Sequence, residues 1–179
     1  MKYEIERQFL LSGLPSTKPD MTADVYSGYY MTEPEEIRVR KRNYTSGSFK
    51  GTTQYSLTIK GKGALVRKEL ETRVSSEFFD LMEKSIGIPF IHKDYYVYNL
   101  DNNLKLEVSV VDYGSPSSFV FAEVEFKTEE EAQNFEFPFK DILIKEITHD
   151  KGYRMASYWY KRMLAMGLLD KDKKNKNKD

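Results

Sequence analysis

The sequence lacks several features that mark large classes of proteins. There is no cysteine among its 179 residues, which excludes a disulfide framework and a thiolate metal site and fits a reducing compartment. No apolar run approaches the ~18 residues of a membrane-spanning helix. The first residues carry acids where a signal peptide would carry bases. We therefore expect a soluble, cytoplasmic protein.

A net charge is also missing. The chain has 28 basic and 28 acidic residues, so no overall field directs it towards nucleic acid or a membrane surface. Histidine is scarce, because His92 and His149 are the only two, and we expect no histidine-based metal cluster. What remains to be explained is where the many charges, 31% of all residues, are placed.

The length and composition predict one domain over residues 1–169, followed by a charged tail over residues 170–179. The tail contains only Lys, Asn and Asp, so it cannot bury a core and is expected to be disordered. Alternating polar and apolar residues predict short strands within the domain. The strongest span residues 2–11, 36–42, 54–60, 68–74, 95–100, 104–110 and 120–127.

Three helices are expected beside these strands. One runs over residues 76–86 and stops at Gly87, and a second follows a capping box formed by Thr128 and Glu131. The third runs from about residue 150 to 165, with apolar residues spaced for one buried stripe. Turn residues between the strands imply hairpins, so the predicted class is α+β with an antiparallel sheet.

The polar faces of the strands repeat charges of one sign. Glu-x-Glu occurs at residues 4–6, 69–71 and 123–125, and Arg-x-Arg at residues 38–40. One interpretation is an ordinary half-buried sheet whose charged face meets water. Like charges at i and i+2 repel, however, and so favour a second interpretation in which a ligand or counter-ion compensates them.

Carboxylates spaced in this way suit a hard divalent cation, Mg²⁺ or Mn²⁺, which prefers oxygen ligands. Arginine forks and lysines on facing strands suit phosphate oxygens. Closing the sheet into a barrel would bring both sets into one interior, with the apolar faces outside under the helices. The pattern thus favours a cavity that holds a metal–polyphosphate complex.

Six motifs, in this order along residues 2–165, resemble the CYTH superfamily of triphosphate tunnel metalloenzymes. They are Glu4-x-Glu6, Arg38-x-Arg40, Leu57-Thr58-Ile59-Lys60, Arg67-x-Glu69-x-Glu71, Glu123-x-Glu125-Phe126 and Glu146-Ile147-Thr148-x-Asp150-x-x-Tyr153. The superfamily includes inorganic triphosphatases, thiamine triphosphatases, a class of adenylyl cyclases and certain RNA triphosphatases. The resemblance implies an eight-stranded antiparallel β-barrel, the triphosphate tunnel, with flanking helices.

The resemblance also implies roles for individual residues. The metal ligands would be Glu4, Glu6, Glu123 and Glu125, with Glu69, Glu71 and Glu107 completing the acidic wall or a second metal site. The triphosphate would be bound by Arg38, Arg40, Lys60 and Lys93, with help from Arg67. The residues expected to act in catalysis are Glu4, Glu6, Glu71 and Glu125, with an acidic side chain orienting the attacking water.

Three positions depart from the superfamily pattern, and each removes positive charge. Gln8 stands where the opening motif has lysine, Tyr95 where a later pair has arginine, and Gly152 where the last motif often has a base. Each lost charge would weaken phosphate binding by about 1.5–3 kcal/mol, the scale of a charged hydrogen bond. Arg42, Lys105 or Arg154 could compensate.

The predicted function is therefore hydrolysis of a triphosphate-containing small molecule, inorganic or organic, with Mg²⁺ or Mn²⁺ as cofactor. Two alternatives remain: a tunnel that binds a nucleotide or polyphosphate without turnover, and an adenylyl cyclase. No membrane partner is expected. Nucleic acid is not expected as a partner either, except that the 5′-triphosphate end of an RNA is retained as a possible substrate. The protein is expected to be a monomer or homodimer.

Overall fold

The structure is a computed structural model that describes residues 2–168. The predicted tail, residues 170–179, lies outside the described residues. Among the described residues, no helix is both long and apolar enough to cross a membrane.

Nine strands and three α-helices make up the described chain, in the following order. β1 (Lys2–Leu11), β2 (Met21–Met31), β3 (Glu36–Tyr44), β4 (Thr53–Lys60) and β5 (Val66–Arg73) precede α1 (Ser76–Ile86). β6 (Ile91–Asn99), β7 (Lys105–Val111) and β8 (Phe119–Phe126) follow, then α2 (Glu129–Asn134), β9 (Leu143–Glu146) and α3 (Met155–Ala165). Short 3₁₀ turns at Asp101–Asn103 and Lys151–Tyr153 precede β7 and α3.

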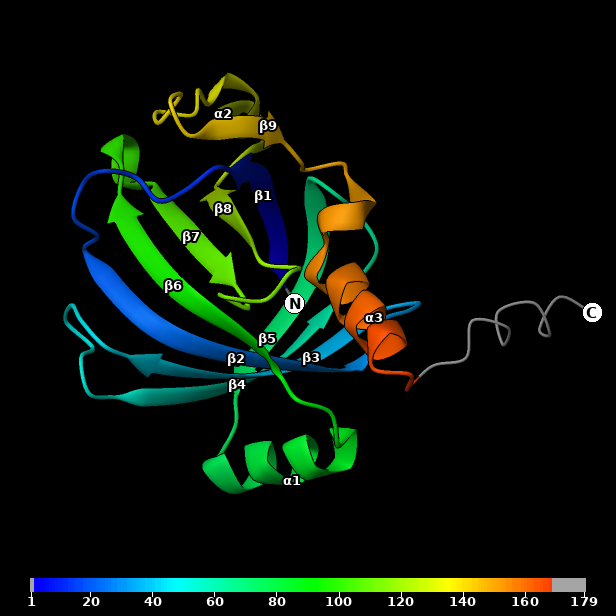
Figure 1. Ribbon diagram of the computed structural model, residues 1–179. Coiled ribbons are helices and arrows are strands. Elements are labelled where there is room, and N and C mark those ends of the chain that lie inside the picture. Colours follow the sequence, from blue (N-terminus) through cyan, green and yellow to red (C-terminus); the bar gives the residue numbers. More distant parts are fainter. Residues whose placement is uncertain (1, 169–179) are drawn as a thin grey trace, which may run out of the picture.

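Eight of these strands close into an antiparallel barrel, as the resemblance implied (Figure 1). The order is β5-β4-β3-β2-β6-β7-β8-β1, and β1 returns to pair with β5. The β1–β5 pairing that closes the barrel is short, because β1 pairs with β5 only over residues 2–5. Over residues 9–11, β1 pairs with β9 instead. Closing the sheet removes free edges and gives every strand one inward and one outward face.

The main apolar core lies outside the barrel wall. Outward side chains of β1, β7 and β8, among them Phe9, Leu106 and Val124, are buried together with Ala132 of α2 and Phe137. This is the inversion expected from the alternation of charged and apolar residues: the hydrophobic face is covered by α2 and the segment after it, and the charged face is left inside.

One end of the barrel is filled by a second apolar cluster. Ile91, Val111 and Phe121 continue the inward-facing rows of β6, β7 and β8 at this end, and they pack with Trp159 and Ala156 of α3. The helix lies beside that end in Figure 1. α3 thus covers part of one barrel mouth, which is why its apolar stripe was visible in the sequence.

The strand predictions were incomplete in three places. β2 and the four-residue β9 were not predicted, and β6 begins at Ile91, four residues before the predicted start. β2 was not predicted because its inward residues are apolar or small and so lack the charged repeat of the other strands. They include Ala23, Val25 and Ser27. The three helices were predicted correctly, with Ser75 and Thr128 as side-chain N-caps of α1 and α2 and a short 3₁₀ turn opening the third.

Candidate functional site

Charged side chains from separate strands meet inside the barrel. The clearest evidence is Lys60 on β4, whose Nζ lies 2.7 Å from Glu4 on β1. β4 and β1 are not neighbours, because β5 lies between them. The two side chains therefore reach across the interior. An open sheet with its charges in water is excluded.

The acidic wall is built by β1, β7 and β8. Register pairs place Glu123 of β8 opposite both Gln8 and Glu107, and Glu125 opposite Glu6. Four carboxylates and one amide thus occupy adjacent positions on three hydrogen-bonded strands. Like charges directly opposite one another destabilise a sheet unless something compensates them.

Gln8 supplies part of that compensation. Its Nε2 donates to Glu6 Oε1 at 2.7 Å and to Glu123 Oε1 at 3.0 Å. The amide therefore bridges two acids at the position where the superfamily pattern has lysine. It satisfies their acceptors but brings no charge, so the repulsion between them persists.

Burial, together with Glu123 and Glu4, raises the pKa of Glu6 well above its usual value, against the opposing effects of Lys60 and Gln8. A carboxyl group in this environment favours either a proton or a metal ion.

Lys60 lies between two acids of this interior. Besides Glu4, its Nζ lies 2.9 Å from Glu69 Oε2, an ion pair that lacks hydrogen-bond geometry, because that oxygen has no hydrogen-bond partner among the described residues. Burial by itself would lower the pKa of Lys60, but Glu6, Glu4 and Glu69 outweigh it and raise the pKa above its usual value. Lys60 is therefore charged in the folded protein.

The basic wall is formed by β3. Arg38, Arg40 and Arg42 alternate along this strand, and each has a buried Nε without a hydrogen-bond partner among the residues that the structure describes. Burial, with Arg38 and Arg42 on either side, lowers the pKa of Arg40. Buried donors are nearly always paired in folded proteins, so three unpaired ones in a row indicate a missing acceptor.

Arg38 is the arginine of this wall with the most protein contacts. Its Nη2 donates to Thr58 Oγ1 at 3.2 Å and lies 3.9 Å from Glu71 Oε2. Thr58 in turn donates to Glu71 at 2.9 Å, and Arg38 also bonds to Tyr29. Arg42 is less bonded and stacks on Tyr95, with its guanidinium 4.6 Å from the ring centre.

Lys93 and Tyr95 project inward from β6. Lys93 is 5% exposed, and its Nζ lies 4.7 Å from the centre of the Phe121 ring. Burial, reinforced by Arg40 and Arg38 and only partly offset by Glu123, lowers the pKa of Lys93 to about 7. Lys93 can therefore gain or lose a proton near neutral pH. The Tyr95 hydroxyl bonds to Glu107, and burial with this acid raises its pKa well above the usual value.

Surface pockets adjoin both ends of the charged interior. A pocket of about 810 Å³ includes Lys60, Arg67 and Arg154 in its lining. Arg67 is held there by Glu36 at 2.7 Å. At the opposite end, a pocket of about 410 Å³ includes Glu107 and Glu125. Lys60 at one end and the acids Glu107 and Glu125 at the other thus border pockets that open to the surface.

The structure thus places the sequence-predicted residues around one interior, although not equally deep in it. Glu71 and Glu125 are exposed near the rim, whereas Arg38 and Lys93 are buried. Among the described residues, the tunnel glutamates do not form a set of three whose oxygens all lie within 4.8 Å. Lys60 and Gln8 take up acceptors of this wall. The acids are close neighbours without being a preassembled metal cage.

Sequence reasoning gave too little weight to two features of the interior. Arg42 was named only as a possible substitute, yet it continues the β3 row with the same unpaired Nε. Tyr29, which bonds to Arg38, lies on the unpredicted β2. The Arg38-x-Arg40-x-Arg42 spacing could have identified the first; no charge pattern marked the second.

No family model matches the chain. A curated inorganic triphosphatase from Nitrosomonas europaea is 29% identical over 151 residues, which cover 84% of this chain and 93% of that protein. The crystal structure of the inorganic triphosphatase NE1496 superposes with a TM-score of 0.57 at 26% identity, covering 88% of this chain and 95% of that one.

A more distant structure shares the fold alone. The PH1819 protein from Pyrococcus horikoshii OT3 matches with a TM-score of 0.52 at 15% identity, over 73% of this chain and 82% of that one.

Proposed function

We propose that this protein is a divalent-metal-dependent triphosphatase of the CYTH superfamily, with inorganic triphosphate as its first expected substrate. The observation that carries the proposal is the β3 arginine row, whose three buried Nε atoms have no acceptor among residues 2–168. The similarity to an inorganic triphosphatase over 84% of the chain supports the same substrate class. A triphosphate offers phosphate oxygens in a row, which suits donors spaced along one strand.

Arg38, Arg40 and Lys60 bind the phosphates in this proposal, with Arg42 as an addition that the structure suggests. Arginine forks bind phosphate oxygens in pairs, and Lys60 adds a point charge. Arg67, at the mouth, is paired with Glu36 and exchanges that partner for phosphate or guides the substrate in. Lys93 becomes charged when the polyanion enters, because the anion favours its protonated form.

The acidic wall fits a hard divalent ion by its chemistry. Its ligands are oxygens, four of them carboxylates on adjacent strands, and burial with Glu123 and Glu4 raises the pKa of Glu6 there. Glu4, Glu6, Glu123 and Glu125 would hold Mg²⁺ or Mn²⁺, with Glu69, Glu71 and Glu107 as further acids of the wall. When bound, the ion neutralises charge on the phosphate oxygens.

The chain's own residues then supply position and charge. The arginines and Lys60 fix the phosphates, which accounts for most of the barrier reduction in phosphoryl transfer. A glutamate at the wall orients the attacking water, and the candidates are Glu4, Glu6, Glu71 and Glu125. Arg38, Thr58 and Lys93 are almost fully buried in this interior, and burial strengthens charge interactions relative to bulk water.

A second function has one specific observation in its favour. Gln8 bridges Glu6 and Glu123 as a neutral donor, so the interior lacks the cation that the superfamily pattern has at this position. A tunnel with this change could bind triphosphate without hydrolysing it. An adenylyl cyclase would need a site for adenine. Among the described residues, the pocket at the Lys60 end has no aromatic lining, so only Tyr3 and Phe126 at the opposite end offer rings to an adenine base.

One screen separates these functions. Purified protein is incubated with inorganic triphosphate, ATP, thiamine triphosphate or a 5′-triphosphorylated RNA, each with Mg²⁺ and with Mn²⁺, and free phosphate and cyclic AMP are measured. The proposal expects phosphate release that stops on metal removal and in Glu4→Ala and Glu125→Ala. Glu136→Ala, at an exposed position in the segment after α2, is the matched control and keeps activity.

Tight triphosphate binding without phosphate release would establish the binding protein instead. Cyclic AMP from ATP would establish the cyclase. Full turnover in both glutamate variants would remove these acids from any metal role.

A further inference from the structure

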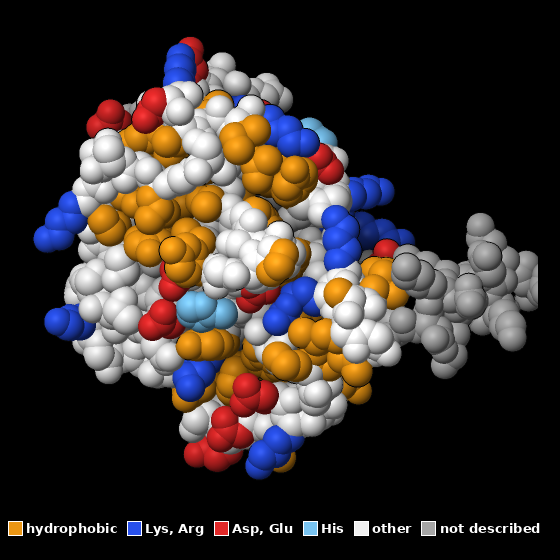
Figure 2. Space-filling view, in the orientation of Figure 1, with side chains coloured by type: hydrophobic (Ala, Val, Ile, Leu, Met, Phe, Trp, Pro, Cys, Tyr) orange, Lys and Arg blue, Asp and Glu red, His pale blue; other side chains and the backbone are white. Residues whose placement is uncertain are grey.

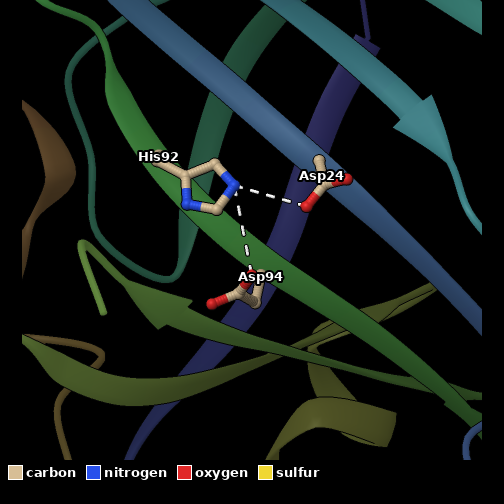
Figure 3. A group of neighbouring side chains, drawn as sticks. All are labelled: Asp24, His92 and Asp94. Atoms are coloured by element: carbon tan, nitrogen blue, oxygen red, sulfur yellow. Dashed lines mark hydrogen bonds and ion pairs between the residues drawn. The ribbon is translucent and has the colours of Figure 1, made fainter. Parts of the chain in front are cut away.

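A second group of metal-ligating side chains lies on the outer face of the barrel. Asp24 projects from β2 and His92 and Asp94 from β6, and one ligand atom of each lies within 4.8 Å of the others (Figure 3). His92 Nε2 is 3.4 Å from Asp24 Oδ1 and 4.0 Å from Asp94 Oδ1. Their side chains are 31–40% exposed, so solvent ions reach them.

The pairing of the strands gives this group an electrostatic problem of its own. Asp24 and Asp94 are direct register partners on β2 and β6. Two carboxylates opposite each other on one face destabilise the sheet, unless a cation lies between them. Figure 2 shows histidine and acidic side chains next to one another on the face in view.

We propose that Asp24, His92 and Asp94 bind a divalent first-row transition ion, with Zn²⁺ as the representative ion. An imidazole beside two carboxylates suits Zn²⁺, Mn²⁺ or Fe²⁺ better than Mg²⁺, which prefers oxygen alone. Two ligands about 2.1 Å from a tetrahedral ion lie about 3.4 Å apart. The His92–Asp24 distance of 3.4 Å has this value, and the His92–Asp94 distance of 4.0 Å is slightly longer.

The backbone beneath these side chains is well ordered for such a site. β2 and β6 pair continuously from Met21–Val97 to Ser27–Ile91, so the three ligands stand on one rigid ladder. The Tyr26 ring lies 4.9 Å from the His92 ring and fixes its tilt. The His92 backbone amide also donates to Asp112 Oδ1 at 3.0 Å.

This site is distinct from the tunnel. On β6, His92 and Asp94 alternate with Lys93 and Tyr95, so the two pairs face opposite sides of the wall. The inference does not depend on the proposed function, since it concerns residues that touch neither wall of the interior. Its place outside the tunnel also gives the two metal sites separate readouts.

The test uses the two histidines of the chain as separate probes. Untagged protein whose two histidines carry an isotope label is titrated with Zn²⁺. The ring signals of His92 and His149 are followed by NMR at fixed pH. The tunnel contains no histidine among its predicted ligands, so an ion bound there leaves both rings unliganded. We expect His92 to shift and saturate with one equivalent while His149 stays unchanged.

Matched variants assign the effect to the three ligands. Asp24→Asn and Asp94→Asn keep size and strand register, and each is expected to weaken Zn²⁺ at His92 by at least about tenfold, the scale found even for outer-shell partners. Glu6→Gln, inside the tunnel, is the control and leaves the His92 response unchanged. Amide spectra of each variant verify that the barrel is folded.

Three results would overturn the inference. His92 could show no response to Zn²⁺, which would leave it as a hydrogen-bond partner of Asp24. His92 and His149 could respond alike, which would indicate non-specific binding. The response could also persist in both aspartate variants of the folded protein, which would place the ion elsewhere.

Discussion

The two charged walls of the tunnel differ in how far the protein itself satisfies them. On the acidic wall, Gln8 bridges two glutamates and Lys60 lies within 3 Å of two more. On the basic wall, the Nε atoms of the three β3 arginines find no acceptor within the described chain. The acids already have protein partners, while the arginines still lack part of theirs.

This difference has a consequence for binding. A phosphate chain can meet unpaired donors on β3 without first breaking protein contacts there, whereas a metal ion must compete with Lys60 and Gln8 for its oxygens. We therefore expect triphosphate to bind in metal-free buffer, and the metal to bind more tightly once the anion is present. The predictions below test the two walls separately.

The largest effect is expected from Arg40→Ala on the basic wall. The loss of a charged hydrogen-bond donor costs about 1.5–3 kcal/mol, so triphosphate affinity should fall about 10–100-fold. Isothermal calorimetry in metal-free buffer measures it. Lys41→Ala, on the same strand but the opposite face, is the matched control and should bind like wild type. Equal affinity in Arg40→Ala and Lys41→Ala would show that the triphosphate lies outside the tunnel.

A smaller gain is expected from Gln8→Lys on the acidic wall. The ammonium would replace the neutral bridge between Glu6 and Glu123 and add a charge facing the phosphates. Triphosphate affinity should rise by up to about tenfold, the low end of a charged hydrogen bond. Phosphate release measured beside binding shows whether the added charge also restores or increases turnover. Unchanged binding and turnover would mean that the amide is an adequate substitute.

A change in protonation is expected at Lys93. Its folded pKa of about 7 lies below the usual value for lysine, so the folded protein binds fewer protons than the unfolded chain above pH 7. This contribution makes the stability of the folded protein rise as pH increases from about 7 towards the normal lysine pKa.

Triphosphate binding at pH 8 should be accompanied by the uptake of a proton at Lys93. Calorimetry in buffers of different ionisation enthalpy detects this uptake. Lys93→Met should lose that part of the uptake, and an unchanged uptake would exclude Lys93 as its source.

The smallest effect is a stability change at Glu6. Its folded pKa is raised, so the folded state holds its proton to higher pH than the unfolded state does. Wild-type stability should therefore fall as pH rises through the range above the usual carboxyl pKa. Glu6→Gln should lack this fall and be the more stable protein at pH 8 without metal. Thermal melting at pH 5 and pH 8 measures this difference, and Glu136→Gln, at an exposed position, is the control. An equal change in melting temperature between the two pH values in Glu6→Gln and Glu136→Gln would contradict the account.

Much of the tunnel could be predicted from the sequence because its inner face carries a repeated signal. Glu4, Glu6, Arg38 and Arg40 alternate with apolar neighbours, and such alternation fixes which side chains share a face. The barrel closure itself came from the resemblance, since no local pattern determines that β1 must pair with β5. Element ends marked by strong caps, such as Ser75 and Gly87 around α1, were also predictable.

What the sequence could not supply was pairing between distant segments. His92 and Asp94 precede the predicted strand, which began at residue 95, and no histidine-based metal cluster was expected. Asp24 joins them only through the β2–β6 register, and β2 itself was not predicted. The bridging contact of Gln8 depends in the same way on the β1–β8 register. Both are outcomes of tertiary pairing, which residue patterns alone leave open.

The most direct test of the central claim is anomalous diffraction from crystals grown with Mn²⁺ and a non-hydrolysable triphosphate analogue. The account predicts a manganese peak beside Glu6 and Glu123 inside the barrel, with phosphate density against Arg38, Arg40 and Arg42. A well-occupied analogue on the outer surface, with neither metal nor phosphate between the two walls, would contradict it.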